Sequence, residues 1–181
     1  MDHVRVRLLG GFGVEVGGEV VHDQRWETRR SRQLVALLAL APVRRTTAEA
    51  AMDALWPDLD PAAARANLHK AASLARRALG GRSSVVFREG TVALWPDAVV
   101  EVDVTAFEAA ADLALGSGDD GACAAAAARF TGDLLPDERY EDWAAPRRER
   151  LARLHLDLLR AGGQWSTVVE VDPTDEAAHR R

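Results

Sequence analysis

One stretch, DPAAARANLHKAASLARRALGG, constrains the fold most because both of its ends carry helix signals. Asp60 can accept hydrogen bonds from the free N–H groups of a first turn, and Pro61 stands where its missing donor costs nothing. Gly80 and Gly81 favour a left-handed stop. The sequence therefore predicts a helix that begins after Asp60 and ends near Leu79.

The two faces of this helix differ in chemistry. At about 100° per residue, small and apolar side chains converge on one stripe, which consists of Ala64, Leu68, Ala71, Ala72, Ala75 and Leu79. The opposite face carries basic and hydrogen-bonding side chains, namely Arg65, His69, Lys70, Ser73, Arg76 and Arg77. Lys70 is the only lysine of the chain. We expect the first face to be packed and the second to meet a partner.

The net charge of −5 hides an asymmetry along the chain. Residues 1–100 hold 14 Lys or Arg against 11 Asp or Glu, a net charge of +3. Residues 101–181 hold 9 against 17, a net charge of −8. A basic front and an acidic rear indicate two domains with different partners.

Composition and processing signals favour a globular cytoplasmic protein without membrane partners. The chain is 48% hydrophobic and 28% charged, and no run approaches the length of a membrane span or a signal peptide. The single cysteine, Cys123, has neither a disulfide partner nor metal-ligand spacing, as expected in a reducing compartment. We interpret it as a small buried residue of an alanine-rich helix.

Short β runs open the chain and helices follow. VRVRLLG, FGVEV and EVVH alternate as strands do, and Gly17-Gly18 predicts a hairpin turn between the last two. TRRSRQLVALLALA predicts a helix that ends at Pro42, with an apolar face of Leu34, Leu37, Leu38 and Ala41. TTAEAAMDALWPD predicts a second helix, because Thr46 and Glu49 have the spacing of a capping box.

After the Asp60 helix, SSVVFREGTVALWP predicts a hairpin joined through Glu89-Gly90, and VVEVDV a further strand. From Asp103 the pattern is helical, in DVTAFEAAADLAL, DDGACAAAAARF and DWAAPRRERLARLHLDLLRAG. The last residues look like the end of one helix and the start of another, capped by Thr174 or Asp175. We expect the natural chain to continue past Arg181.

Catalytic patterns are absent from the sequence. The five histidines show no HxH, HExxH or Cys-His spacing, and there is no GxSxG elbow or phosphate-binding glycine loop. The carboxylate pairs Asp119-Asp120 and Glu141-Asp142 are typical of solvated turns and helix faces. We therefore expect no enzyme activity, no cofactor and no metal.

A helix-turn-helix motif explains the two faces of the Asp60 helix better than an active site does, because the second helix of this motif enters the major groove of DNA. Base contacts are expected from the N-terminal half of the outer face, at Arg65, His69 and Lys70. Phosphate contacts are expected from its C-terminal half, at Ser73, Arg76 and Arg77. The last two arginines would also be favoured by the helix dipole alone, so the whole face carries the prediction.

Two further features agree with DNA binding. Arg29, Arg30 and Arg32 stand at a helix start, where positive charge is unfavourable unless a phosphate docks there; the alternative is that an arginine-rich chain tolerates them. The hairpin of residues 87–94, with Arg88 and Thr91 beside its turn, could lie against a neighbouring groove as a wing.

Several stretches, in linear order, resemble the SARP family of actinobacterial antibiotic-regulatory activators. VRVRLLGGFGVEVGG is similar to the opening strands, RRSRQLVALLALAP to the first helix, ALWPD to the end of the second and RANLHKAASLARRALG to the recognition helix. VEVDVTAFEAA resembles the domain junction, and GDLLPDERYEDWAAPRRERLARLHLDLL and EVDPTDEAAHRR the activation domain. Ala72 departs from the pattern, which usually has a larger apolar residue there.

The resemblance implies an α+β fold followed by an all-α one: an OmpR-type winged helix over residues 1–102 and a tetratricopeptide-like bacterial transcriptional activation domain over 103–181. It adds Asn67 to the contacts of the recognition helix, residues 61–79, and assigns phosphate contacts to Arg29, Arg30 and Thr46. It further implies a nucleoid-associated activator that binds direct repeats in double-stranded promoter DNA, allows a homodimer there and recruits RNA polymerase.

A different class of function remains open at this point. The helical hairpins could bind a protein partner while the winged helix serves as a scaffold. A structure in which the outer face of the Asp60–Leu79 helix packs against the second domain would favour that alternative.

Overall fold

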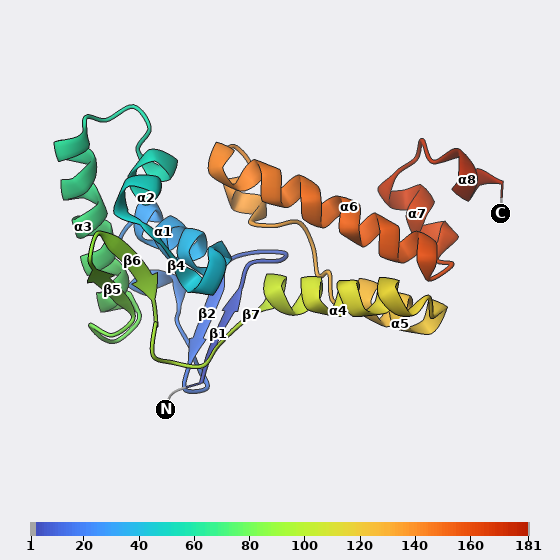
Figure 1. The fold of residues 1–181 in the computed structure, drawn as a ribbon, viewed down its shortest axis with the longest axis horizontal. Helices are drawn as coiled ribbons and strands as arrows, with labels where there is room; N and C mark the ends of the chain where they lie inside the picture. Colours follow the sequence, from blue (N-terminus) through green and yellow to red (C-terminus); the bar gives the residue numbers. More distant parts are fainter. Residues whose placement is uncertain (1–2, 181) are drawn as a thin grey trace. The chain divides into compact units, whose positions relative to one another are not determined.

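The computed structural model describes residues 3–180 and divides the chain into two compact units (Figure 1). The first comprises the residues up to Leu8 together with Phe12–Asp103. The second comprises Leu9–Gly11 together with Val104 and the residues that follow. The short segment Leu9–Gly11 therefore belongs to the second unit, although the residues on either side of it belong to the first.

A four-stranded sheet of order β3-β2-β1-β7 begins the first unit, formed by β1 (Val4–Arg7), β2 (Gly13–Val16), β3 (Glu19–Val20) and β7 (Val100–Val102). The first three strands pair antiparallel, and the predicted hairpin turn at Gly17-Gly18 is confirmed, with φ of 61° and 87°. Pairing of β7 with β1 is parallel. No local signal reveals that pairing, because 92 residues lie between the two strands.

Three helices form the centre of the first unit: α1 (Arg29–Leu40), α2 (Ala48–Leu55) and α3 (Pro61–Ala78). Short 3-10 turns cover Asp23–Arg25 and Pro42–Arg44. The second sheet has the order β4-β6-β5, with β4 (Arg45–Thr47), β5 (Val85–Arg88) and β6 (Thr91–Leu94). The predicted hairpin is confirmed, since Glu89 and Gly90 turn between β5 and β6 with φ of 49° and 76°.

Two details differ from the sequence-based prediction. The cap of α2 is Thr47, whose side chain accepts from Ala50 N, so the predicted capping box of Thr46 and Glu49 is wrong. Thr46 lies in β4 instead and pairs with Val92 of β6; with only three residues, β4 is too short to be predicted from its sequence. The buried surface of α1 is also wider than the single apolar face that the sequence predicts, because Val35, Ala36 and Ala39 are buried along with Leu34 and Leu38.

A strained turn between α1 and β4 is held by Arg44. Val43 and Arg44 have φ of 46° and 55°, in the left-handed region that β-branched residues rarely adopt. The Arg44 guanidinium donates to the carbonyl oxygens of Leu94, Trp95 and Ala98 at 3.2–3.3 Å. These bonds connect the turn to the end of β6 and compensate for its backbone strain.

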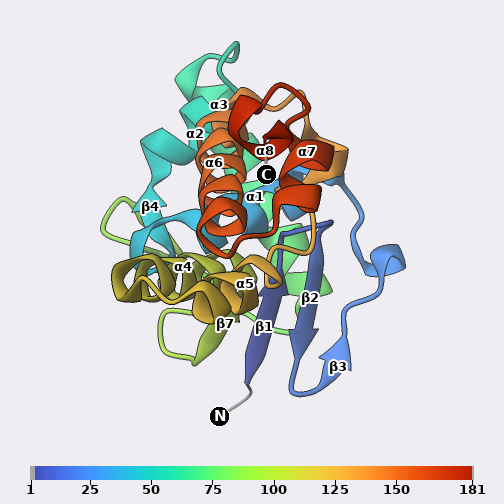
Figure 2. The same cartoon turned by 90° about the vertical axis from the view of Figure 1, so that its right-hand side faces the viewer.

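The second unit is helical, with α4 (Asp103–Ser117), α5 (Asp120–Ala127), α6 (Ala145–Ala161), α7 (Trp165–Val171) and α8 (Glu176–His179). Short 3-10 turns lie at Pro136–Glu138 and Asp142–Ala144. Successive helices α5, α6, α7 and α8 pack on their neighbours (Figure 2). The core includes Phe107, Leu151 and Val168, and Cys123 is buried as expected.

Glycines permit a close backbone approach between Leu9–Gly11 and the loop before Pro136. Gly10 N donates to Asp133 O, and Leu9 bridges to Leu134. A Cβ on Gly10 would lie 2.9 Å from Thr131 O, and a Cβ on Gly132 would lie 2.9 Å from Gly10 Cα. This contact explains why the tip of the first hairpin belongs to the helical unit.

Candidate nucleic-acid interface

The candidate interface is built on α3, whose ends form as the sequence predicts. Asp60 Oδ1 accepts from the backbone N–H groups of Ala62 and Ala63 at 3.0 Å. At the other end, Gly80 has φ +84°, and Gly81 N donates to Arg76 O at 3.0 Å. These contacts are those of a Schellman stop. Both ends are therefore fixed by local chemistry.

Burial divides α3 into the two predicted faces. The whole apolar stripe from Ala64 to Leu79 is buried, and Leu74 and Ala78 extend it toward α1 and α2, on which α3 packs. Side chains of the opposite face remain accessible: Arg65, His69, Lys70, Ser73 and Arg77 are exposed, and Asn67 and Arg76 are half-buried. Ala72 is fully buried, so the helix packs closely at the position where the resemblance expects a larger residue.

Strand β5 contacts this outer face through Phe87. The His69 ring lies against the Phe87 ring with 4.6 Å between centroids. Arg76 Nε donates to Val85 O at 2.7 Å, and the Arg76 guanidinium lies 5.6 Å from the Phe87 centroid. Two of the predicted contact residues are therefore oriented by the neighbouring strand.

The basic side chains of unit 1 differ in whether a carboxylate neutralises them. Arg77 donates to Glu27 at 2.6 Å, whereas the Arg32–Asp23 and Arg88–Asp97 pairs are longer, at 3.7 Å. Across residues 3–180, no carboxylate pairs with Arg65, Lys70 or Arg82. Arg65, Lys70 and Arg82 therefore leave positive charge on α3 and on the turn that follows it available for a new partner.

At the start of α1, the arginines are arranged around the Thr28 cap, whose side chain accepts from Ser31 N. Arg29 is exposed, and Arg30 donates to Gln33 at 2.7 Å. The Arg32 guanidinium lies 5.7 Å from the Phe12 ring centroid. Thr46, in β4, is half-buried. The three arginines therefore come from α1 and Thr46 from β4, and local contacts hold Arg30 and Arg32 in place.

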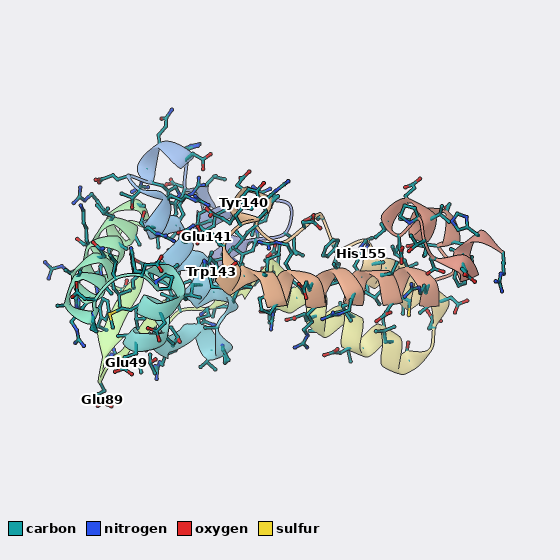
Figure 3. All side chains as sticks on the ribbon, turned by 90° about the horizontal axis from the view of Figure 1, so that it is seen from above. Glu49, Glu89, Tyr140, Glu141, Trp143 and His155 are labelled. Carbon is teal, nitrogen blue, oxygen red and sulfur yellow. The ribbon has the colours of Figure 1, made fainter. Side chains whose placement is uncertain are left out.

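The tip of the β5–β6 hairpin is less basic than its sequence suggests. Thr91 Oγ1 donates to Arg88 O, which stabilises the turn, and Arg88 itself pairs with Asp97. Glu89 is exposed at the tip (Figure 3). Gly90 O accepts from Ala48 N at the start of α2. Glu49 follows there and is exposed too. A DNA backbone would meet carboxylates as well as Arg88 at this point.

Two residues of this surface have no clear signal in the local sequence. Glu27 pairs with Arg77 over a separation of 50 residues, which no local pattern reveals. Arg82 follows the Gly80-Gly81 stop as an isolated arginine, so only its place beside the C-terminal turn of α3 could have indicated it.

Comparison with solved structures places this geometry in a known fold. EmbR from Mycobacterium tuberculosis, solved in complex with a low affinity phosphopeptide, superposes with a TM-score of 0.70 and 23% identity. The chain has the fold of EmbR. The match covers 94% of this chain and 49% of the EmbR chain, so the chain spans about half the length of EmbR. No protein-family model matches the sequence, and no curated protein matches it significantly.

Within residues 3–180, no group of three or more His, Cys, Asp or Glu side chains could hold a metal ion. No helix of that part of the chain is both long and apolar enough to cross a membrane.

Proposed function

We propose that the chain is a SARP-type transcriptional regulator. Residues 1–102 would bind promoter DNA as an OmpR-type winged helix, and residues 103–181 would act as a bacterial transcriptional activation domain. The observation that carries this proposal is the division of α3 into a buried apolar face and an accessible basic face. The fold shared with EmbR and the linear series of SARP-like stretches support it.

The length of α3 assigns different tasks to its two ends. From Arg65 to Arg77 the helix rises about 18 Å, at about 1.5 Å per residue. In a helix-turn-helix protein, the N-terminal residues of the recognition helix contact base edges, so the C-terminal end of so long a helix is expected to contact the DNA backbone. Arg65, Asn67, His69 and Lys70 would read bases, and Ser73, Arg76 and Arg77 would meet the phosphates at the rim of the groove.

Arg29, Arg30, Arg32 and Thr46 would add phosphate contacts, and the β5–β6 hairpin would act as the wing. The alternative is a protein-interaction module with the winged helix as scaffold, and an outer face of α3 that is covered by the helical domain would favour it. Repeated sites would allow a homodimer on DNA, and the helical domain would recruit RNA polymerase. Such a regulator would work in the cytoplasm, at the nucleoid.

The experiment is selection of the purified chain on a pool of random duplexes at two salt concentrations, followed by sequencing of the retained DNA. A repeated motif whose retention falls with salt would support specific promoter binding, because each neutralised phosphate releases counterions. Arg65→Ala/Lys70→Ala is the matched variant, since both side chains are exposed and unpaired by carboxylates in residues 3–180. Failure of the wild-type chain to retain any duplex at low salt would exclude DNA binding.

A further inference from the structure

An open groove lies at the C-terminal end of α3, with a volume of about 730 Å³. One wall is formed by α3 and the turn that follows it, through Ser73, Arg76, Arg77, Gly80, Gly81 and Arg82. Strand β5 forms the other wall, through Val86 and Phe87. Three arginines and no acidic residue line it in the described chain, so its chemistry favours an anion.

Arg76 is held in place before any ligand arrives. Its Nε donates to Val85 O, and its guanidinium lies over the Phe87 ring, so that a carbonyl and an aromatic face fix the plane of the group. A guanidinium has five N–H donors in a planar fork, and only the Nε donor is used by Val85. The remaining donors can bind an oxyanion with little further loss of side-chain entropy.

Arg82 supplies a second cation that is not committed elsewhere. It is exposed, and no carboxylate of residues 3–180 pairs with it. Gly80 and Gly81 beside it carry no side chains, and a Cβ on Gly80 would meet nothing within 4 Å. The groove is therefore open toward solvent next to Arg82, while Arg77, at its edge, is already paired with Glu27.

We propose that this groove binds a backbone phosphate of duplex DNA, with Arg76 and Arg82 as its clamp and Ser73 as a hydrogen-bond donor. The inference rests on the proposed function, which puts the C-terminal end of α3 at the rim of the major groove. It adds Arg82 as a contact residue and gives Arg76 a defined geometry. Because phosphates are the same in every sequence, the site contributes affinity and no base preference.

The test measures binding of the full chain to two duplexes, the motif obtained by selection and one fixed unrelated sequence, between 50 and 200 mM salt. Arg82→Ala is the variant and Arg82→Lys its conservative partner. Arg7→Ala is the charge-matched control, because Arg7 is exposed on β1 of the other sheet and outside the groove. Far-UV circular dichroism shows that each variant is folded.

We expect Arg82→Ala to bind both duplexes about tenfold more weakly, as loss of a charged hydrogen bond predicts. Its slope of log Kobs against log salt should fall by about 0.9, which corresponds to one phosphate. Arg82→Lys should restore the slope, and Arg7→Ala should leave it unchanged.

Three outcomes overturn the inference. If Arg82→Ala keeps the wild-type slope, or if Arg7→Ala matches its loss, the groove holds no phosphate although the proposed function stands. If Arg82→Ala changes the preferred sequence instead of the slope, Arg82 contacts bases. If the wild-type chain binds neither duplex at 50 mM salt, the proposed function fails and this site with it.

Discussion

Arg77 of α3 and Glu27, two residues before α1, form an ion pair with 2.6 Å between Arg77 Nη1 and Glu27 Oε1. Both side chains are exposed, at 67% and 48% of their maximum. The pair connects the C-terminal end of the candidate recognition helix to the segment before α1. A phosphate that approaches Arg77 must therefore compete with a carboxylate of the same chain.

Glu27→Gln should strengthen DNA binding. The amide keeps the shape of the side chain but removes the negative charge that occupies Arg77 and repels phosphate. Since exposed ion pairs contribute up to about 1 kcal/mol, we expect a Kd up to about fivefold lower at low salt. Fluorescence anisotropy with a fixed duplex measures this change. Glu19→Gln, an exposed glutamate on β3, serves as the control, and equal gains from both variants would contradict a specific role of Glu27.

Lys70→Ala and Arg29→Ala should have different effects on specificity. Lys70 lies on the exposed face of α3, where a base contact is expected, so its loss should cost about 1–3 kcal/mol at one position of the binding site. Arg29 lies at the start of α1 and should weaken binding to all sequences alike. Competition assays with single-base variants of the selected motif separate the two patterns. Uniform weakening by Lys70→Ala would show that Lys70 contacts phosphate.

The faces of α3 could be predicted because their signals are local. Asp60, Pro61 and the glycine pair fix the ends of the helix, and its periodicity gives the buried stripe. Arg76 and Arg77 are neighbouring arginines that the sequence does not distinguish in role. In the structure, however, Arg76 donates to a backbone carbonyl of β5 and Arg77 pairs with the carboxylate of Glu27. That difference depends on tertiary partners, which periodicity does not reveal.

Elements that depend on distant partners were missed for the same reason. Both Thr46 and Thr47 are suitable N-cap residues, so the sequence alone does not choose between them. In the structure Thr46 pairs with Val92 in the second sheet, and Thr47 caps α2. The parallel pairing of β1 with β7 likewise joins the two ends of the first unit. Which basic residues remain unpaired, Arg82 among them, follows from the packing of the whole unit.

Arg44 offers a test of the strained turn through two matched variants. Arg44→Ala and Arg44→Gly both remove the hydrogen bonds to Leu94, Trp95 and Ala98, so both should lower the free energy of unfolding by about 2 kcal/mol. Glycine accepts φ of 55° without the Cβ clash, so Arg44→Gly should be about 1 kcal/mol more stable than Arg44→Ala. Urea unfolding measures both values. Equal stabilities would show that the backbone at this position relaxes.

His155 should make the helical unit sensitive to acid. Its ring stacks on Phe130 with 4.3 Å between centroids, and partial burial lowers the pKa of His155 below 6.5, although the charge of Asp133 opposes this shift. Above the unfolded pKa the ring is neutral in both states and the full stability is present. As pH falls through that value, the unfolded chain binds a proton first, so the free energy of unfolding decreases.

His155→Phe keeps an aromatic ring against Phe130 and removes the titration. We expect the variant to lose less stability than the wild type between pH 7.5 and pH 5.5, when unfolding in urea is followed by circular dichroism. The carboxylates of the helical unit contribute equally to both proteins, so the difference between them isolates His155. Identical losses in the two proteins would mean that the ring is accessible enough to be protonated in the folded state at its ordinary pKa.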